Sequence, residues 1–173
     1  LLDIKSVHFL RETGLSPFTK VLLGASDGCL ANLGADAVLP SEAAVTLGTS
    51  GAIRTISDRI HLHPEGKTFC YYLDQGKYVI GGAVNNGGNV MTYLSGLLQE
   101  SVGTVYESLP EILQATEPGA EGLVFVPYVF GERAPHYDGH LTGGFYGITP
   151  LHERKHFVRA VVEGILFNLK EVL

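Results

Sequence analysis

The chain is poor in cysteine and methionine, and this scarcity excludes several classes of protein. Its two cysteines, Cys29 and Cys70, lie far apart and form no CxxC pair. Neither a zinc site nor a disulfide framework is therefore indicated, and we expect a cytoplasmic protein in a reducing compartment. Methionine occurs once, as Met91, so we do not expect Leu1 to be an original start.

Charged residues are also sparse, at 17% of the chain, and the positive ones are fewer, with 12 Lys and Arg against 18 Asp and Glu. A nucleic-acid binder needs clustered Lys and Arg, and no basic run here is longer than Arg154-Lys155. Long apolar runs are missing too, because the longest uncharged run, residues 78–99, carries five Gly and three Asn. We therefore expect a small metabolite as the partner, with neither nucleic acid nor membrane.

Apolar residues, in contrast, make up 45% of the 173 residues, enough for one globular domain with a real core. The final segment, residues 151–173, has the pattern of an apolar-faced helix that meets no terminating signal at its end. We therefore expect residues 1–173 to be a single, incomplete domain of a larger protein.

Two β-rich runs, residues 43–47 and 52–56, flank a turn of small residues and predict a β-hairpin. We expect the two turn glycines to take positive φ and to leave successive backbone N–H groups open to an anion. The two hydroxyl side chains between them add further donors. An ordinary hairpin turn is the alternative, because these residue types are common in turns. The turn consists of Gly48, Thr49, Ser50 and Gly51.

A carboxylate stands at an expected helix start earlier in the chain. Residues 18–23 form an apolar run that enters the sequence GASDG, and residues 29–34 have the pattern of a short helix. The orphan N–H groups and the dipole at such a start favour an ionised Asp27. Asp27 is then either a plain N-cap or a general base held at the end of a rigid element.

Residues 68–73 and 78–84 predict a second hairpin, so that successive antiparallel strands form a sheet with the turn at its rim. The sequence NNGGN at residues 85–89 then leads into a helix over 90–98, whose apolar residues share one face. A glycine-rich helix start suits an anion or a nucleotide, although Asn and Gly also cap helices for structural reasons. The apolar residues of that face are Val90, Met91, Leu94, Leu97 and Leu98.

His61 and His63 form an HxH pair in a polar connection between the hairpins. No third ligand stands near them in the sequence, so a solvated loop is favoured over a metal site.

The almost unbroken apolar run at residues 122–129 predicts a strand buried on both faces. Glu132 and Arg133 follow it, either as a structural pair or as groups that shape a site at the end of the strand. In the last helix, Ala160 and Gly164 permit close packing against the sheet. Arg159 and Glu163 of the same helix are expected to form a surface or interlobe pair.

Taken in order, these motifs resemble the carboxy-terminal lobe of the FGGY family of carbohydrate kinases. The resemblance covers residues 15–173, through GASDG, LGTSG, GGAVNNGG, PYVFGERAPH, LTGGFYGI and RAVVEGILFNL. Within the family, the NNGG turn and GERAPH are most similar to the gluconate kinases. The resemblance implies an α/β lobe of the actin-like, ribonuclease H-like type, with a mixed sheet flanked by helices.

The resemblance also implies ATP and magnesium as cofactors, in a cleft closed by a similar amino-terminal lobe of the same protein. Asp27 matches the family's catalytic base, which would accept the proton of the sugar's terminal hydroxyl during attack on the γ-phosphorus. The metal ligands and most sugar contacts are expected from the other lobe, and an adenosine loop is expected beyond the last helix. The nucleotide-binding residues implied are Gly48, Thr49, Ser50, Gly51 and Gly88, and the substrate-binding residues expected are Asp27, Gly28, Asn86 and Gly87.

We therefore expect phosphorylation of D-gluconate to 6-phosphogluconate, with the amides near Asn86 and Gly87 as donors to the substrate carboxylate. Three alternatives stay open: a kinase for xylulose or another pentulose, an inactive sugar-binding regulator, and a structural domain whose glycines only make turns. We expect the chain alone to be inactive, because half a cleft cannot enclose the phosphates. A homodimer is a further expectation that stays open.

Overall fold

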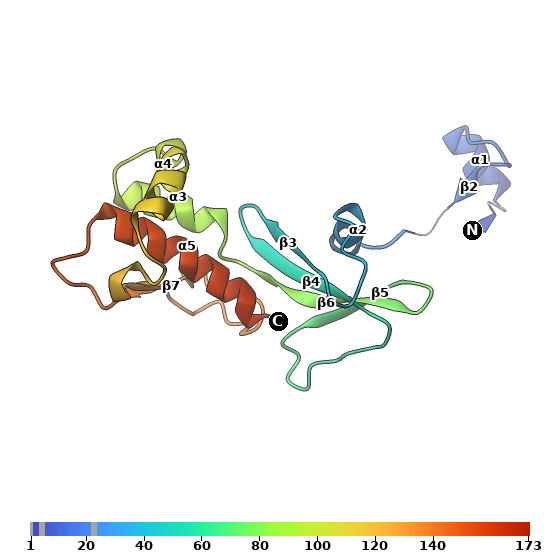
Figure 1. Ribbon diagram of the computed structural model, residues 1–173. Coiled ribbons are helices and arrows are strands. Elements are labelled where there is room, and N and C mark those ends of the chain that lie inside the picture. The colour runs from blue at the N-terminus through green and yellow to red at the C-terminus, as the bar shows by residue number, and fades with distance from the viewer. Residues whose placement is uncertain (1, 4–5, 22–23) are drawn as a thin grey trace.

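The computed structural model describes residues 2–3, 6–21 and 24–173, and Figure 1 shows the arrangement of its elements. At the amino-terminal end, β1 (Leu2–Asp3) pairs antiparallel with β2 (Lys20–Val21), and α1 (Val7–Thr13) lies between them in sequence. The helix α1 ends at Gly14, whose φ of 69° is the left-handed conformation that favours glycine. Of the apolar run expected at residues 18–23, Leu22 and Leu23 lie outside the described residues.

A four-stranded sheet forms the middle of the chain, and both expected hairpins are confirmed. Its strands are β3 (Ala43–Leu47), β4 (Gly51–Ser57), β5 (Phe69–Asp74) and β6 (Lys77–Val84), in the order β3-β4-β6-β5. All three ladders are antiparallel. In the β5–β6 turn, Gln75 and Gly76 take φ values of 48° and 78°, as a two-residue hairpin of matching twist requires.

Successive side chains of each strand point to opposite faces of this sheet, and a different helix packs on each face. On one face, Ile56 of β4 packs with Val79 and with Cys29 of α2 (Asp27–Gly34). On the other face, Ile53 packs with Val84 and with Leu169 of α5 (Arg154–Glu171). The sheet therefore carries α2 on one side and α5 on the other.

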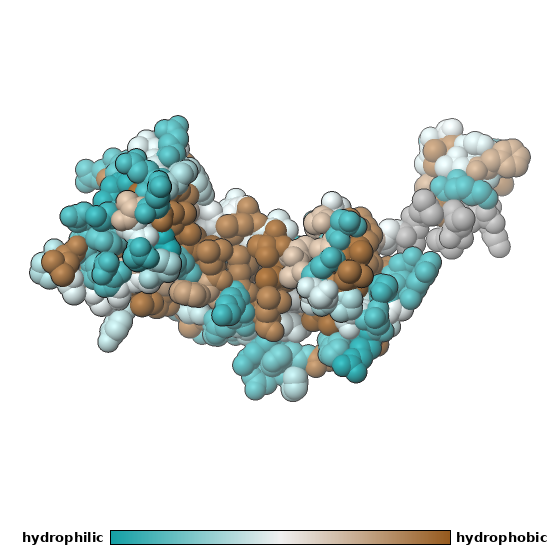
Figure 2. Space-filling view, viewed as in Figure 1, coloured by the Kyte–Doolittle hydropathy of each residue, from teal (hydrophilic) through white to brown (hydrophobic). Residues whose placement is uncertain are grey.

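The strand β3 lies at an edge of the sheet and exposes part of its apolar surface. Val45 and Leu47 are 54% and 50% exposed. Figure 2 shows hydrophobic side chains gathered over this part of the molecule, between α2 and the helices near the carboxy-terminal end.

The larger core lies between three helices and a small second sheet. These elements are α3 (Gly88–Leu97), α4 (Val102–Ala115), α5, and the antiparallel pair β7 (Val124–Val126) and β8 (Gly144–Tyr146). A short 3₁₀ turn, Ala120–Gly122, precedes β7. The expected apolar face of α3 is confirmed for Val90, Met91 and Leu94, whereas Leu97 is 57% exposed. The buried residues of this core include Val90, Met91, Leu94, Val105, Ile112, Leu123, Phe125, Val158, Val161 and Ile165.

The expected burial of β7 on both faces is wrong. Phe125 is 4% exposed, but its neighbours Val124 and Val126 are 49% and 37% exposed. Among the described residues β7 pairs only with β8, and α5 covers only the face that carries Phe125. An apolar run alone therefore did not establish that both faces of the strand are covered.

The expected pairing of Arg159 with Glu163 is confirmed, but its expected place at the surface is wrong. Their side chains are only 12% and 16% exposed, and Arg159 Nε lies 2.6 Å from Glu163 Oε1. Arg159 also donates to the carbonyl oxygens of Leu113 and Thr116, and Glu163 accepts from the amide of Gly119. The pair therefore fastens the connection after α4 onto α5.

No helix among the residues that the structure describes is long and apolar enough to cross a membrane.

The close packing expected at Gly164 gives a prediction for stability. A Cβ at this position would lie 2.6 Å from the carbonyl oxygen of Phe125, whereas one at Gly96 of α3 would have nothing within 4 Å. We expect Gly164→Ala to lower the free energy of unfolding by about 1–3 kcal/mol, since α5 must move away from β7. Gly96→Ala, the matched control, should leave it unchanged or raise it by up to about 1 kcal/mol. Urea unfolding of both variants checks this, and equal effects would contradict the packing described.

Candidate functional site around Asp27 and the GTSG turn

The helix α2 presents Asp27 at its exposed amino-terminal end. Ser26, not Asp27, is the N-cap, because the Ser26 hydroxyl oxygen accepts a hydrogen bond from the amide of Cys29. The capping interpretation of Asp27 is therefore wrong. One carboxylate oxygen, Oδ1, accepts from the amide of Gly28 at 2.7 Å, and Oδ2 has no partner among the described residues. A free oxygen on a backbone-oriented carboxylate is what a general base requires.

Asp27 opens onto a cavity of 480 Å³ between α2 and the sheet. An arginine of β4, Arg54, lines the same cavity, and this residue was missed by the sequence analysis. Its Nη1 donates to the Thr46 hydroxyl at 3.2 Å, across the β3–β4 ladder. Thr46 lies two residues before Gly48, so Arg54 is bonded to the strand that leads into the turn. The residues that line the cavity are Ser26, Asp27, Gly28, Cys29, Arg54, Phe69, Tyr71 and Tyr72.

The turn at residues 48–51 follows β3 as expected, but its glycines act differently from the prediction. Neither Gly48 nor Gly51 has positive φ. Gly51 is buried, and a Cβ there would lie 3.0 Å from Val84 and 3.1 Å from Leu169, so space and not conformation requires glycine. The prediction that Gly51 contacts the nucleotide is at odds with this burial.

The turn packs directly on the start of α3. The amide of Gly88 donates to the carbonyl oxygen of Gly48 at 2.7 Å, and the amide of Asn89 donates to that of Thr49 at 3.1 Å. A Cβ on Gly88 would lie 2.8 Å from the Gly48 oxygen, so this contact requires glycine. The first amides of α3 are therefore engaged, which corrects the expectation of an open anion site at this helix start.

The donors that stay available belong to the middle of the turn. Thr49 is exposed and Ser50 is half-buried. Among the described residues, neither their hydroxyls nor their backbone amides donate a hydrogen bond. These two residues are the part of the turn that can meet an anion.

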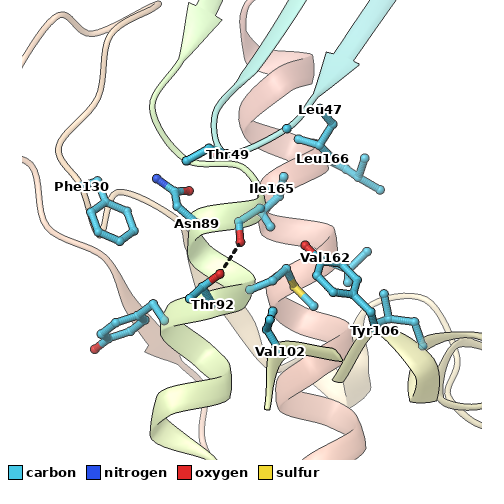
Figure 3. A pocket seen from close by; sticks show the side chains of 15 residues that line it. Leu47, Thr49, Asn89, Thr92, Val102, Tyr106, Phe130, Val162, Ile165 and Leu166 are labelled. Carbon is cyan, nitrogen blue, oxygen red and sulfur yellow. Dashed lines mark hydrogen bonds between the residues drawn. The ribbon is translucent and has the colours of Figure 1, made fainter. Parts of the chain in front are cut away.

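A larger cavity of 780 Å³ begins at Gly48, Thr49 and Gly88 and continues between α3, α4 and α5. Figure 3 shows Thr49, Asn89 and Thr92 near one another and apolar side chains over the rest of the wall. A polar mouth with an apolar interior suits a ligand with an anionic end and a flat apolar body. Ser50 and Gly51 do not line it. The lining residues include Leu47, Met91, Val102, Tyr106, Leu109, Phe130, Val162, Ile165 and Leu166.

Glu132 holds the second turn, residues 85–89, in place. Its carboxylate is 2% exposed and accepts hydrogen bonds from the side-chain amides of Asn86 at 2.9 Å and Asn168 at 2.6 Å. The backbone amides of Asn85 and of Arg133 also donate to it. No ion pair involves Glu132 in the described part of the chain, and the Arg133 side chain binds Asn85 and the Val84 carbonyl instead. The Glu-Arg sequence is thus not an ion pair, and Glu132 is a structural residue beneath the site.

This network corrects the roles expected for Asn86 and Gly87. Asn86 is fully buried, and its side chain donates to Gly131 and Glu132 and accepts from the amide of Phe130. The amide of Gly87 donates to Asn89 Oδ1 at 2.8 Å. The Asn86 side chain and the Gly87 amide therefore have no donor left for a substrate carboxylate.

The HxH pair makes only local contacts. His61 Nε2 accepts from Arg59, and His63 Nδ1 accepts from the amide of Glu65. Among residues 2–3, 6–21 and 24–173 there is no group of three His, Cys, Asp or Glu side chains that could hold a metal ion.

A family model described as the carboxy-terminal domain of the FGGY family of carbohydrate kinases matches residues 43–173. The chain belongs to the FGGY family of carbohydrate kinases. A gluconokinase from Bacillus subtilis is 43% identical over 169 residues, and a xylulose kinase from Lactococcus lactis is 33% identical over 152 residues. These alignments cover 93% and 88% of this chain but 33% and 30% of the relatives. The chain thus spans about a third of the length of the FGGY kinases that it matches.

Two solved FGGY structures from Lactobacillus acidophilus superpose closely on the chain. A gluconate kinase gives a TM-score of 0.83 at 38% identity, and a xylulose kinase gives 0.82 at 39% identity. Each match covers 96% of this chain and 34% of the other. The expected actin-like α/β lobe is thereby confirmed.

The buried hydrogen bonds of Glu132 give a second prediction. We expect Glu132→Ala to lower the free energy of unfolding by about 2–5 kcal/mol, because it leaves several buried N–H donors unpaired. Glu132→Gln should cost less, since it keeps one acceptor oxygen and the shape. Glu111→Ala, at an exposed glutamate of α4, is the control and should change the value by less than about 0.5 kcal/mol. Chemical unfolding measures all three, and a Glu132→Ala variant as stable as the control would refute the network.

Proposed function

We propose that a full-length protein carrying this chain transfers the γ-phosphate of ATP to the terminal hydroxyl of a sugar acid, D-gluconate, and gives 6-phosphogluconate. One observation carries the proposal: Asp27, with its free oxygen, lines a cavity between α2 and the sheet whose strands β3 and β4 flank the turn that presents Thr49 and Ser50. A base packed against a sheet and a set of phosphate donors at the rim of that sheet are the parts that in-line phosphoryl transfer needs. The 43% identity to a gluconokinase supports the choice of acceptor.

In this mechanism Asp27 orients the acceptor hydroxyl and takes its proton as the oxygen attacks the γ-phosphorus. The hydrogen bond from the Gly28 amide to Oδ1 fixes the carboxylate and leaves Oδ2 available to the acceptor hydroxyl. Because the transition state of phosphoryl transfer is loose, orientation contributes more than basicity.

Thr49 and Ser50 contact the phosphates with hydroxyl and amide donors, and the 780 Å³ cavity receives the nucleoside. The apolar wall of α3, α4 and α5 fits a base and a ribose better than it fits a free sugar. When bound, Mg²⁺ would neutralise the charge of the phosphates. The described residues include no cluster of ligands for it, so we assign its protein ligands to the amino-terminal lobe.

A xylulose kinase is the second candidate, and the likeness to the xylulose kinase of L. acidophilus, with a TM-score of 0.82, favours it. The inactive regulator is less favoured, because a binding protein has no need of a carboxylate held with one oxygen free.

The role of Asp27 gives a kinetic prediction. We expect Asp27→Asn to lower kcat by about two to four orders of magnitude while the KM for ATP changes little, because a positioned general base is lost. Asp36→Asn is the matched control, since Asp36 is exposed beyond the other end of α2 and its φ of 56° tolerates asparagine. Steady-state kinetics of both variants check this. A kcat for Asp27→Asn close to that of the control would remove Asp27 from the mechanism.

Thr49→Val should behave differently from Asp27→Asn. Loss of a phosphate-contacting hydroxyl raises the KM for ATP as well as slowing turnover. Equal kinetic profiles for the two variants would contradict the roles assigned to them.

The choice of substrate is tested by a coupled assay with gluconate, xylulose, ribulose and glycerol. We expect the highest kcat/KM for gluconate, because a site that binds a carboxylate leaves its donors unpaired when a neutral sugar enters. A neutral sugar that surpasses gluconate would overturn the acceptor and leave the kinase proposal in place.

A further inference from the structure

We infer that Arg54 binds the carboxylate of the sugar acid and so determines the preference for an acidic over a neutral acceptor; this rests on the function proposed above. Arg54 lies on β4, on the face of the sheet that α2 covers, and its backbone oxygen accepts from the side chain of Asn32 in that helix. Its guanidinium lines the 480 Å³ cavity together with Asp27.

The guanidinium has unused binding capacity. Only Nη1 makes a hydrogen bond, to the Thr46 hydroxyl, and no carboxylate of the described residues forms an ion pair with Arg54. An arginine carries five N–H donors in a planar fork that fits a carboxylate with two parallel hydrogen bonds. Thr46 therefore fixes one edge of the group and leaves the rest of the fork to the cavity.

The absence of a side chain at Gly28 leaves space for the guanidinium next to the residue that follows Asp27. A Cβ at this position would lie 3.3 Å from Arg54 Nε, 3.5 Å from Nη2 and 3.6 Å from Cζ. The glycine thus lies against the guanidinium, where a larger side chain would push Arg54 away from the cavity. This contact gives a physical reason for glycine directly after the proposed base.

Among the described residues, the rest of the cavity wall contains no second carboxylate and no second cation. Phe69 and Tyr71 stack with ring centroids 4.5 Å apart, and Tyr72 lies next to them. The described part of the cavity wall therefore has one anionic group, Asp27, and one cationic group, Arg54. A sugar acid that places its hydroxyl at Asp27 and its carboxylate at Arg54 matches this polarity, and a neutral polyol leaves the guanidinium unpaired.

The test compares Arg54→Gln and Arg54→Lys with Arg59→Gln in a full-length protein carrying this chain. Arg59 is exposed, lies outside the cavity and donates to His61, so its loss changes net charge equally without touching the site. The acceptors are D-gluconate and D-glucitol, the polyol in which the carboxylate is replaced by a hydroxymethyl group. The KM for ATP is measured alongside.

We expect Arg54→Gln to lower kcat/KM for gluconate by about 10²- to 10³-fold, mainly through KM, as for a lost charge-paired contact. Activity toward glucitol should not fall, because glucitol has no carboxylate contact to lose, and the KM for ATP should stay unchanged. The kcat/KM of Arg54→Lys for gluconate should lie between those of Arg54→Gln and the unmodified protein, because lysine keeps the charge but lacks the planar fork of donors. Arg59→Gln should match the unmodified protein.

Two results would overturn the inference. Unchanged gluconate kinetics in Arg54→Gln would make Arg54 a plain surface arginine, and equal losses with both acceptors together with a raised KM for ATP would make it a phosphate contact. Failure of the proposed function is seen separately, as an unmodified protein that does not phosphorylate gluconate. In that case gluconate is tested as a competitive inhibitor of the sugar that is phosphorylated, and the inference requires its inhibition constant to rise in Arg54→Gln.

Discussion

The hydrogen bonding of the buried Glu132 carboxylate is the contact on which the geometry of the site depends. No cation among the described residues pairs with it, so N–H donors alone offset its desolvation. Apart from the amide of the neighbouring Arg133, those donors come from the turn at residues 85–89 and from α5, which are thereby joined just beyond the end of the β4–β6 ladder. The start of α3 is then fixed, and its first amides hold the carbonyl groups of the turn at residues 48–51.

Local elements of the fold could be predicted because their signals are local. Both hairpins, the start of α3 and the long last helix follow from β-rich runs, glycine turns and apolar periodicity. Burial was predicted less well, because it depends on what covers an element from elsewhere in the chain. Val124 and Val126 are exposed although they are as apolar as Phe125, and the side chain of Arg159 is only 12% exposed, with hydrogen bonds to a connection 40 or more residues away.

The site residues also differ in whether they could be predicted from local sequence. Asp27 and Thr49 were found because each stands in a short motif whose backbone geometry follows from its own sequence. Arg54 was missed, and Glu132 was expected beside the wrong partner, Arg133, since the partners Thr46 and Asn168 lie on other elements. Asn86 was placed at the substrate for the opposite reason: its position in a glycine-rich turn suggests exposure, whereas Glu132 draws its side chain inward.

Under the proposed function, this lobe places its positive charge where that charge can distinguish an acidic sugar from a neutral one. The turn at residues 48–51 offers neutral donors from Thr49 and Ser50, and the amides of α3 are already engaged. Neutral donors suffice for the phosphates of ATP, whose charge Mg²⁺ would neutralise. These phosphates are the same whichever sugar is the acceptor. A cation at the turn would bind ADP as well as ATP and would not distinguish one sugar from another. The charge of Arg54, in contrast, lies beside the acceptor. It stays unpaired whenever the sugar lacks a carboxylate, and the free-energy cost of the unpaired charge lowers the affinity only for neutral sugars.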